Sequence, residues 1–233
     1  MSRLFQFGFF IILCNFLTSC NGQTNPEKST VKTTIQKNKL VGGGCDGCEI
    51  MFAGMPANIN AVDTSEAWAE KGQKLLVTGI TYKIDGKTPV PNVVIYYWQT
   101  DNNGYYSPKI GMEEKARRHG HIRGWVRTDQ HGRYSIYTIR PAPYPGENIP
   151  AHIHTSIKEP NIENEYYIDE FVFDDDKLLT DEKRKALENR GGSGILRVLN
   201  LDNLQIAGHN IILGLNIPNY PTTVKSEKQP GLQ

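Results

Sequence analysis

Two pairs of histidines, each with one residue between them, are the first candidates for chemistry in this chain. His152 and His154 lie in the segment Pro-Ala-His-Ile-His at 150–154. In an extended strand, residues two apart point to the same face, so both imidazoles can reach one metal ion. His119 and His121 have the same spacing but follow two arginines, and this charged segment predicts a solvent-exposed loop. The first pair is therefore the candidate metal site.

Tyrosine is the second residue type that stands out, with 11 copies. Tyr105 and Tyr106 follow the turn sequence Asn-Asn-Gly at 102–104, and Tyr144 lies between prolines in the segment 140–145. Proline keeps Tyr144 off a central strand, so core packing does not account for it. Ordinary packing on strands is expected for most of the other tyrosines, including Tyr96, Tyr97, Tyr134 and Tyr137.

The first twenty residues are typical of a bacterial lipoprotein signal. Arg3 precedes an apolar stretch at 4–17, which is shorter than the roughly 20 residues of a membrane-spanning helix and matches a secretory signal. The stretch ends in Leu-Thr-Ser-Cys at 17–20, which resembles a lipobox. We therefore predict that residues 1–19 are a lipoprotein signal peptide and that Cys20 is lipidated. The alternative is an ordinary signal peptide with a chance cysteine.

The segments that flank the predicted domain are polar. Residues 20–39 contain no aromatic side chain and predict a flexible tether, and residues 222–233 predict a disordered tail. Residues 40–221 are then expected to form one folded domain. A lipid anchor at Cys20 would hold this domain to a membrane of the cell envelope, facing the periplasm or the cell surface.

Two further cysteines, Cys45 and Cys48, lie in a glycine-rich segment. Such a C-x-x-C pair occurs in redox dithiols, in zinc sites and in small structural disulfides. There is no second pair of this kind, so histidines would have to complete a zinc site. Because the N-terminus indicates export to an oxidising compartment, a Cys45–Cys48 disulfide is the prediction.

The body of the chain has the pattern of a mainly β protein. Runs of β-branched and aromatic residues are separated by turn sequences rich in Asp, Asn and Gly. These runs cover residues 74–83, 92–99, 121–127, 133–139, 151–157, 166–173 and 204–215. Helices are expected only at 65–71, 112–118 and 175–189, the last with Thr180 as N-cap. The predicted fold class is an antiparallel β-sandwich with short helical excursions.

Composition excludes two broad classes of function. The chain has 26 Lys and Arg against 25 Asp and Glu, a formal net charge of +1, and no long basic run, which argues against a nucleic-acid binder. Hydrophobic residues make up 38% of the chain, which excludes a membrane protein with several spans.

Four segments, taken in order, resemble the intradiol ring-cleavage dioxygenases, the family of catechol 1,2- and protocatechuate 3,4-dioxygenases. They are residues 86–99, 103–107, 128–141 and 150–154. The most specific are the Thr-Asp-x-x-Gly-x-Tyr turn within the third and the Pro-Ala-His-Ile-His strand. The resemblance runs from about residue 75 to residue 173. It includes neither the lipobox, nor the C-x-x-C pair, nor the chain beyond residue 175.

The resemblance implies a mononuclear non-haem ferric ion held by two tyrosines and two histidines. Carried over to this sequence, these ligands are Tyr106, Tyr144, His152 and His154, with Tyr105 as the alternative to Tyr106. Imidazole suits iron, and hard phenolate oxygens favour its ferric state. The bound cation deprotonates tyrosines, whose free pKa is about 10. In the family mechanism a catechol replaces the bound hydroxide and one tyrosine, and these two bases take up its protons. The candidate catalytic residues are therefore Tyr106 and Tyr144.

The implied reaction is the intradiol cleavage of a catechol-type aromatic compound with O2, which gives a muconate-type diacid. A homo-oligomer is a candidate assembly. Two other interpretations stay open: a non-catalytic, transthyretin-like β-sandwich binding module of the envelope, and a variant in which His152 and His154 hold zinc. The combination of two tyrosines with two histidines favours the ferric enzyme.

One departure from the family pattern concerns a positive charge. Family members usually have an arginine just before the Pro-Ala-His-Ile-His motif, where this chain has Ile149. The segment that leads from the second tyrosine to the histidines is also short. Arg123, Arg127 and Arg140 are candidates to supply the missing charge.

Overall fold

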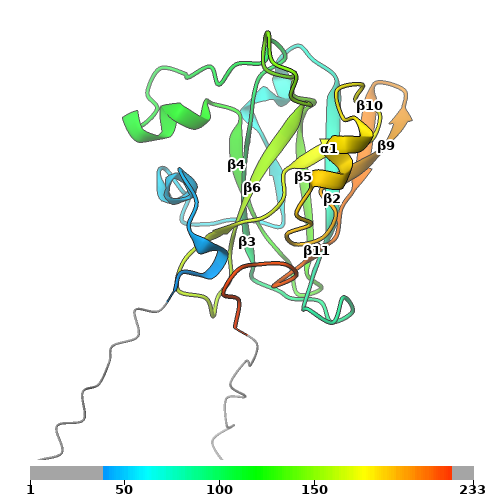
Figure 1. The fold of residues 1–233 in the computed structure, drawn as a ribbon. Coiled ribbons are helices and arrows are strands. Elements are labelled where there is room, and N and C mark those ends of the chain that lie inside the picture. The colour runs from blue at the N-terminus through cyan, green and yellow to red at the C-terminus, as the bar shows by residue number, and fades with distance from the viewer. Residues whose placement is uncertain (1–38, 222–233) are drawn as a thin grey trace, which may run out of the picture. The chain divides into compact units, whose positions relative to one another are not determined.

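The computed structural model describes residues 39–221, and these residues form a mainly β fold, as predicted (Figure 1). The predicted signal peptide, the predicted lipidation site Cys20, the tether up to residue 38 and the tail at 222–233 lie outside the described residues. Within the described part of the chain, no helix combines the length and the apolar character needed to cross a bilayer.

The described residues contain eleven strands, which join in one mixed sheet. In chain order the strands are β1 (Val62–Thr64), β2 (Lys74–Tyr82), β3 (Val94–Gln99), β4 (Arg123–Arg127), β5 (Arg133–Ile139), β6 (His152–Lys158), β7 (Tyr166–Tyr167), β8 (Phe171–Phe173), β9 (Ile195–Leu201), β10 (Leu204–Gly208) and β11 (Ile211–Ile212). The hydrogen-bonded order is β1-β5-β2-β10-β9-β8-β6-β3-β4, with β11 beside β2 and β7 beside β6. A bond from Arg127 N to Asn60 O (2.8 Å) brings the two ends of this order together, so the sheet is nearly closed.

The strand pairing differs in part from a purely antiparallel sandwich. The neighbours β1–β5, β2–β10, β2–β11 and β8–β9 run parallel, and the other pairs run antiparallel. Parallel partners cannot be joined by a short hairpin and come from separate parts of the chain. The local turn signals that predict hairpins therefore carry no information about these pairs.

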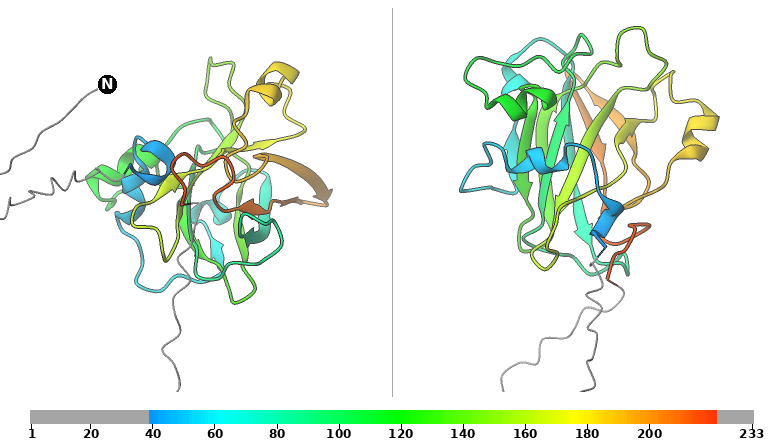
Figure 2. Two further views of the ribbon diagram at one scale, coloured as in Figure 1. Left: turned by 60° about the horizontal axis from the view of Figure 1, so that its bottom comes forward. Right: turned by 60° about the vertical axis from the view of Figure 1, so that its left-hand side comes forward.

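The strands curve into two facing layers with the main core between them (Figure 2). On β3, Ile95 and Tyr97 point into this core, while Tyr96 and Trp98 point to the opposite face and pack near Met51. Because both faces of β3 are covered, all of its residues are buried. This two-sided burial explains why its sequence is almost continuously apolar.

The helical segments are short and lie outside the layers. They are the 3-10 helices η1 (Val41–Gly43), η2 (Cys48–Phe52), η3 (Glu66–Ala69) and η4 (Glu114–His119), and the helix α1 (Asp181–Ala186). Each of the three predicted helices is present in shortened form as η3, η4 or α1. The hydroxyl of Thr180 accepts a bond from Lys183 N (3.4 Å), as expected for an N-cap. α1 buries none of its side chains, so no packing stabilises further turns.

Candidate metal centre

The two histidines of the Pro-Ala-His-Ile-His segment lie on the outward face of β6. Residue alternation points Ile153 into the main core and directs His152 and His154 to the other face. The pairing of β6 with β3 places Trp98 opposite His154, and their rings stack with centroids 4.8 Å apart. The neighbouring strand therefore sets the plane of the His154 ring.

The loop that carries Tyr106 is organised around one carboxylate. Oδ1 of Asp101 accepts bonds from the backbone amides of Asn103 (2.8 Å) and Tyr105 (3.1 Å), and Oδ2 accepts the hydroxyl of Ser107 (2.7 Å). Burial by itself would raise the pKa of Asp101, but these bonds outweigh it and lower the pKa. The ionised side chain thus fixes the backbone on both sides of Tyr106.

The loop that carries Tyr144 packs directly on the first loop. Ala142 N donates to Asp101 O (3.1 Å), and the hydroxyl of Thr100 donates to Ala142 O (2.7 Å). Gly104 has φ +87°, and a Cβ at this position would lie 2.8 Å from Pro145 Cδ and closer still to Pro143 O. Only glycine fits this approach, so the turn sequence before the tyrosines has a structural reason.

Four polar atoms converge where these loops meet β6. Tyr144 Oη lies 2.6 Å from Tyr106 Oη, 3.0 Å from His152 Nε2 and 3.4 Å from His154 Nε2. His154 Nε2 lies 3.1 Å from His152 Nε2 and 2.8 Å from Tyr106 Oη. Donors that share one metal ion at about 2.1 Å stand about 3.0–3.4 Å apart. The four side chains therefore already have close to the mutual spacing of a metal-ligand set.

The Nδ1 partners of the histidines determine which imidazole nitrogen carries the hydrogen. His152 Nδ1 lies 2.8 Å from the carbonyl oxygen of Pro150, so this nitrogen is the donor. His154 Nδ1 lies 2.7 Å from Tyr167 Oη and 3.1 Å from Glu170 Oε1. Tyr167 donates its hydrogen to Glu170 (2.9 Å), so His154 Nδ1 must also be a donor. Both Nε2 lone pairs consequently point towards the phenol oxygens.

Burial controls the protonation of the phenols. Removal from water raises the pKa of Tyr106, and so does its contact with Tyr144. Burial likewise raises the pKa of Tyr144. Both hydroxyls stay protonated at neutral pH unless a cation favours the phenolate form.

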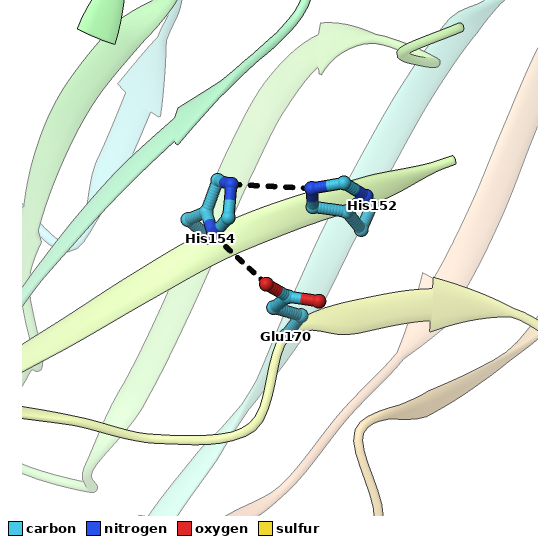
Figure 3. A group of neighbouring side chains, drawn as sticks. All are labelled: His152, His154 and Glu170. Carbon is cyan, nitrogen blue, oxygen red and sulfur yellow. Dashed lines mark hydrogen bonds and ion pairs between the residues drawn. The ribbon is translucent and has the colours of Figure 1, made fainter. Parts of the chain in front are cut away.

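Figure 3 shows His152 and His154 beside Glu170, a residue that the sequence analysis did not single out. Glu170 immediately precedes β8, which pairs with β6. Burial would raise the pKa of Glu170, but the hydrogen bond from His154 and the other contacts lower it to about 2. The register between β6 and β8 brings Glu170 to His154, and no sequence motif reveals that register.

A cavity of about 430 Å³ opens beside the four converging side chains. Its lining includes Tyr106, Tyr144, His154, Trp98, Tyr167 and Glu170. The Cys45 end of the C-x-x-C segment forms part of the wall, and the structure joins Cys45 to Cys48 in a disulfide. Ser156 Oγ on β6 donates to Cys48 Sγ (3.1 Å), which attaches this ring to the strand that carries the histidines.

The structure distinguishes the predicted ligands from the alternative tyrosine and the alternative histidine pair. Tyr105 is 58% exposed and takes no part in the cluster, whereas Tyr106 does. The prediction that His119 and His121 lie in an exposed loop is wrong, because both are buried. His119 Nδ1 contacts Tyr96 Oη (2.8 Å), and His121 contacts Ser107 O and Glu70. These partners hold the two rings apart.

The arginines proposed as charge donors have other partners. Arg123 bonds to Ala53 O and stacks on Tyr96 and Trp125, and Arg140 forms an ion pair with Asp175 (2.6 Å). Neither lines the cavity beside the tyrosines, and Arg127 does not line it either. The arginines that do line it are Arg118 and Arg190.

The donor set fits ferric iron. Two phenols and two imidazoles combine hard oxygen donors with nitrogen donors suited to iron. His152, His154 and Glu170 also form a group whose ligand atoms lie within 4.8 Å of one another. However, Glu170 contacts Nδ1 of His154, on the side of the ring away from the phenols. An ion among the four converging atoms would bind at Nε2 and leave Glu170 as the partner of its ligand.

Comparison with known proteins identifies what this arrangement resembles. A family model described as "Dioxygenase" matches residues 51–193. The catechol 1,2-dioxygenase of Acinetobacter baylyi is 30% identical over 121 residues, which cover 45% of this chain and 38% of that enzyme. The beta chain of protocatechuate 3,4-dioxygenase from Burkholderia cepacia is 34% identical over 104 residues, which cover 42% and 43% of the two chains. The chain thus spans less than half the length of these curated relatives.

A solved structure shares the fold. The wild-type catechol 1,2-dioxygenase of Acinetobacter radioresistens matches 67% of this chain and 58% of its own with a TM-score of 0.50 at 17% identity. The matched family segment contains all four converging side chains and Glu170, and it ends shortly after Arg190.

Proposed function

The chain belongs to the intradiol ring-cleavage dioxygenase family, and we propose that it cleaves a catechol between its two hydroxyl-bearing carbons with O2. The proposed ligands of the ferric cofactor are Tyr106, Tyr144, His152 and His154. The observation that carries this proposal is the convergence of two phenol oxygens and two Nε2 lone pairs within 2.6–3.4 Å. When bound, ferric iron supplies a Lewis acid that draws electron density from the catechol and activates the ring towards O2.

The phenol oxygens are suited to move the substrate's protons. Burial raises the pKa of both tyrosines, so each phenolate is intrinsically a strong base. A bound cation weakens this basicity, and the basicity returns when a second anion binds the same cation. A catechol has two hydroxyl protons to lose. We propose that Tyr106 Oη or Tyr144 Oη accepts one of them, in the role of general base.

Hydrogen bonds at Nδ1 fix the orientation of both histidine rings. His152 donates from Nδ1 to the backbone carbonyl of Pro150, and His154 donates from Nδ1 to Tyr167 Oη, beside the Glu170 carboxylate. Trp98 stacks on the ring of His154 and the ring of Tyr167 lies tilted beside it, which limits rotation of the imidazole. The cavity volume of about 430 Å³ exceeds what one catechol ring needs, so substituted catechols are the proposed substrate class.

The two alternative interpretations account for less of this geometry. Zinc at His152 and His154 would not explain why two buried phenols lie against the same Nε2 atoms. A binding module without catalysis would not require a cavity that ends on this polar cluster.

The test is to load the purified protein with ferric iron and record its visible spectrum. Tyrosinate-to-iron charge transfer should colour the protein red to purple, with about one iron per chain. Oxygen uptake with catechol and with substituted catechols then measures turnover. A colourless protein that takes up zinc stoichiometrically but not iron would overturn the proposal.

We also propose that the protein is exported and anchored to an envelope membrane through a lipid on Cys20. The support is the sequence of residues 1–20, with its apolar stretch followed by Leu-Thr-Ser-Cys. Cys20→Ser should abolish labelling with a lipid precursor and release the protein from the membrane fraction or leave it unprocessed. Unlabelled wild type would contradict the anchor. Gel filtration of a chain that starts at residue 39 would test for a homo-oligomer.

A further inference from the structure

Glu170 contacts one of the four proposed ligands but is not itself a member of the proposed ligand set. Its Oε1 lies 3.1 Å from His154 Nδ1 and 2.9 Å from the hydroxyl of Tyr167, which itself lies 2.7 Å from His154 Nδ1. These three side chains form a closed triangle on one side of the His154 ring. The phenols of Tyr106 and Tyr144 lie on the other side, at Nε2.

Proton accounting shows that the hydrogens of this triangle point towards the carboxylate: Tyr167 Oη accepts the hydrogen of His154 Nδ1 and donates its own to Glu170 Oε1, which itself lies 3.1 Å from Nδ1. Glu170 is ionised and can only accept, Tyr167 has one hydrogen to give, and His154 has one at Nδ1. A negative charge 3.1 Å from Nδ1, which also polarises the phenol that accepts the Nδ1 hydrogen, gives the imidazole partial imidazolate character and makes Nε2 a stronger donor. The negative charge of Glu170 therefore acts on the metal position through the imidazole ring of His154.

The charge balance of the site indicates a role for the contact between Glu170 and His154. Two tyrosinates leave a ferric ion with one uncompensated positive charge, whereas a ferrous ion with the same ligands is already neutral. A third negative charge next to a ligand therefore favours the ferric state over the ferrous state. Glu170 is the carboxylate that lines the cavity in contact with a proposed ligand.

We propose that Glu170 is a positioning residue that fixes the Nδ1–H tautomer of His154 and, through that imidazole, holds the iron in its ferric state. This inference rests on the proposed function, because it needs iron at Tyr106, Tyr144, His152 and His154. It goes further in assigning a role to a residue that contacts the iron ligand rather than the iron.

The experiment compares the iron-loaded wild type with Glu170→Gln, which keeps the shape of the side chain and removes its charge. Loss of an outer partner of a metal ligand typically costs 10–100-fold in metal affinity. We expect ferric iron to leave the variant for a chelator at least 10-fold faster. A tenfold loss of preference for the ferric over the ferrous ion raises the one-electron reduction potential by about 59 mV. The tyrosinate band should move to longer wavelength, because the iron becomes more electron-poor.

Two further variants separate charge from structure. Glu163→Gln makes the same substitution at an exposed carboxylate and should leave the potential and the spectrum unchanged. Tyr167→Phe keeps the carboxylate and removes only the phenol, so its potential should change by less than that of Glu170→Gln. Equal shifts in Tyr167→Phe and Glu170→Gln would overturn the assignment to charge. Circular dichroism and thermal melting establish that each variant is folded.

The outcomes distinguish this inference from the function it rests on. A wild type with no tyrosinate-to-iron band refutes both. A wild type with the band, together with a Glu170→Gln variant whose potential, band and iron release match the wild type within twofold, refutes the inference alone. Complete loss of the iron and of the band in Glu170→Gln would also overturn it, because Glu170 would then be a ligand.

Discussion

Replacing Gly104 by alanine should damage the metal centre without touching any proposed ligand. Gly104 lies two residues before Tyr106, at the point where the two tyrosine loops meet. Its φ of +87° is unfavourable for any residue with a Cβ, and the added carbon would overlap Pro143 O and lie 2.8 Å from Pro145 Cδ. The loops must therefore separate, and Tyr106 must move away from Tyr144.

The magnitude follows from two contributions. A left-handed backbone costs a non-glycine residue about 1–2 kcal/mol. Insertion of a carbon into a closely packed contact costs about 1–3 kcal/mol more. The sum of about 2–5 kcal/mol should lower the melting temperature by about 2–4 °C for each kcal/mol. The donor atoms stand only 2.6–3.4 Å apart, so a shift on the order of 1 Å separates the set, and such a shift can reduce activity about 100-fold.

Gly111→Ala is the matched control. Gly111 has nearly the same φ, +88°, but no atom lies within 4 Å of its added Cβ. It should lose only the backbone contribution and keep full iron stoichiometry. The assays are thermal melting, iron content and the visible spectrum of both variants. If Gly104→Ala retained wild-type iron content and melted no lower than Gly111→Ala, the proposed coupling between the two loops would be refuted.

Three further predictions follow from contacts described above or from buried groups nearby. Tyr144→Phe removes one phenolate, so iron content should fall and the visible band should weaken or shift, whereas Tyr105→Phe should leave both unchanged. Burial raises the pKa of Glu159, so the folded state favours its protonated form, and the contribution of this side chain to stability should fall as pH rises above about 4.3. The lowered pKa values of His119, His152 and His209 act in the opposite direction. The quantity to measure is therefore the difference in free energy of urea unfolding between the wild type and Glu159→Gln from pH 4 to 8. This difference should move in favour of the variant as pH rises. Replacing Cys45 and Cys48 together by serine opens a ring of four residues and should cost about 2 kcal/mol in urea unfolding.

Each of these has an outcome that contradicts it. Equal iron loss in Tyr105→Phe would mean that the wrong tyrosine was chosen. A difference in unfolding free energy between the wild type and Glu159→Gln that stays constant with pH would contradict the raised pKa of Glu159. A doubly substituted cysteine variant as stable as the wild type would mean that the fold alone holds the 45–48 segment in place.

The sequence predicts the part of the site that depends on local pattern. Alternation along a strand is enough to place His152 and His154 on one face, and the structure does so. Proline on either side of Tyr144 predicts a loop position, and the structure has one. These inferences succeed because each depends on residues within a few positions of one another.

The rest depends on partners that are distant in the chain. Glu170 reaches His154 only through the register between β6 and β8, and no local pattern encodes it. The sequence around His119 predicts an exposed position because its neighbours are charged, and the structure buries it. In η4 it shares the buried face with Ala116, three residues earlier, while Arg117 and Arg118 face outward. The parallel strand pairs went unpredicted for the same reason as the Glu170 contact.

The stacking of Trp98 on His154 makes the fluorescence of this indole a reporter of the metal centre. The indole lies between two imidazoles, with ring centroids 4.8 Å from His154 and 4.1 Å from His119. An iron ion bound at Nε2 of His154 would quench the fluorescence of this indole, since open-shell metal ions deactivate nearby excited states. The other tryptophans, Trp68 and Trp125, do not contact the proposed ligands in this way. Occupation of the centre can therefore be followed through intrinsic emission at concentrations too low for the visible band.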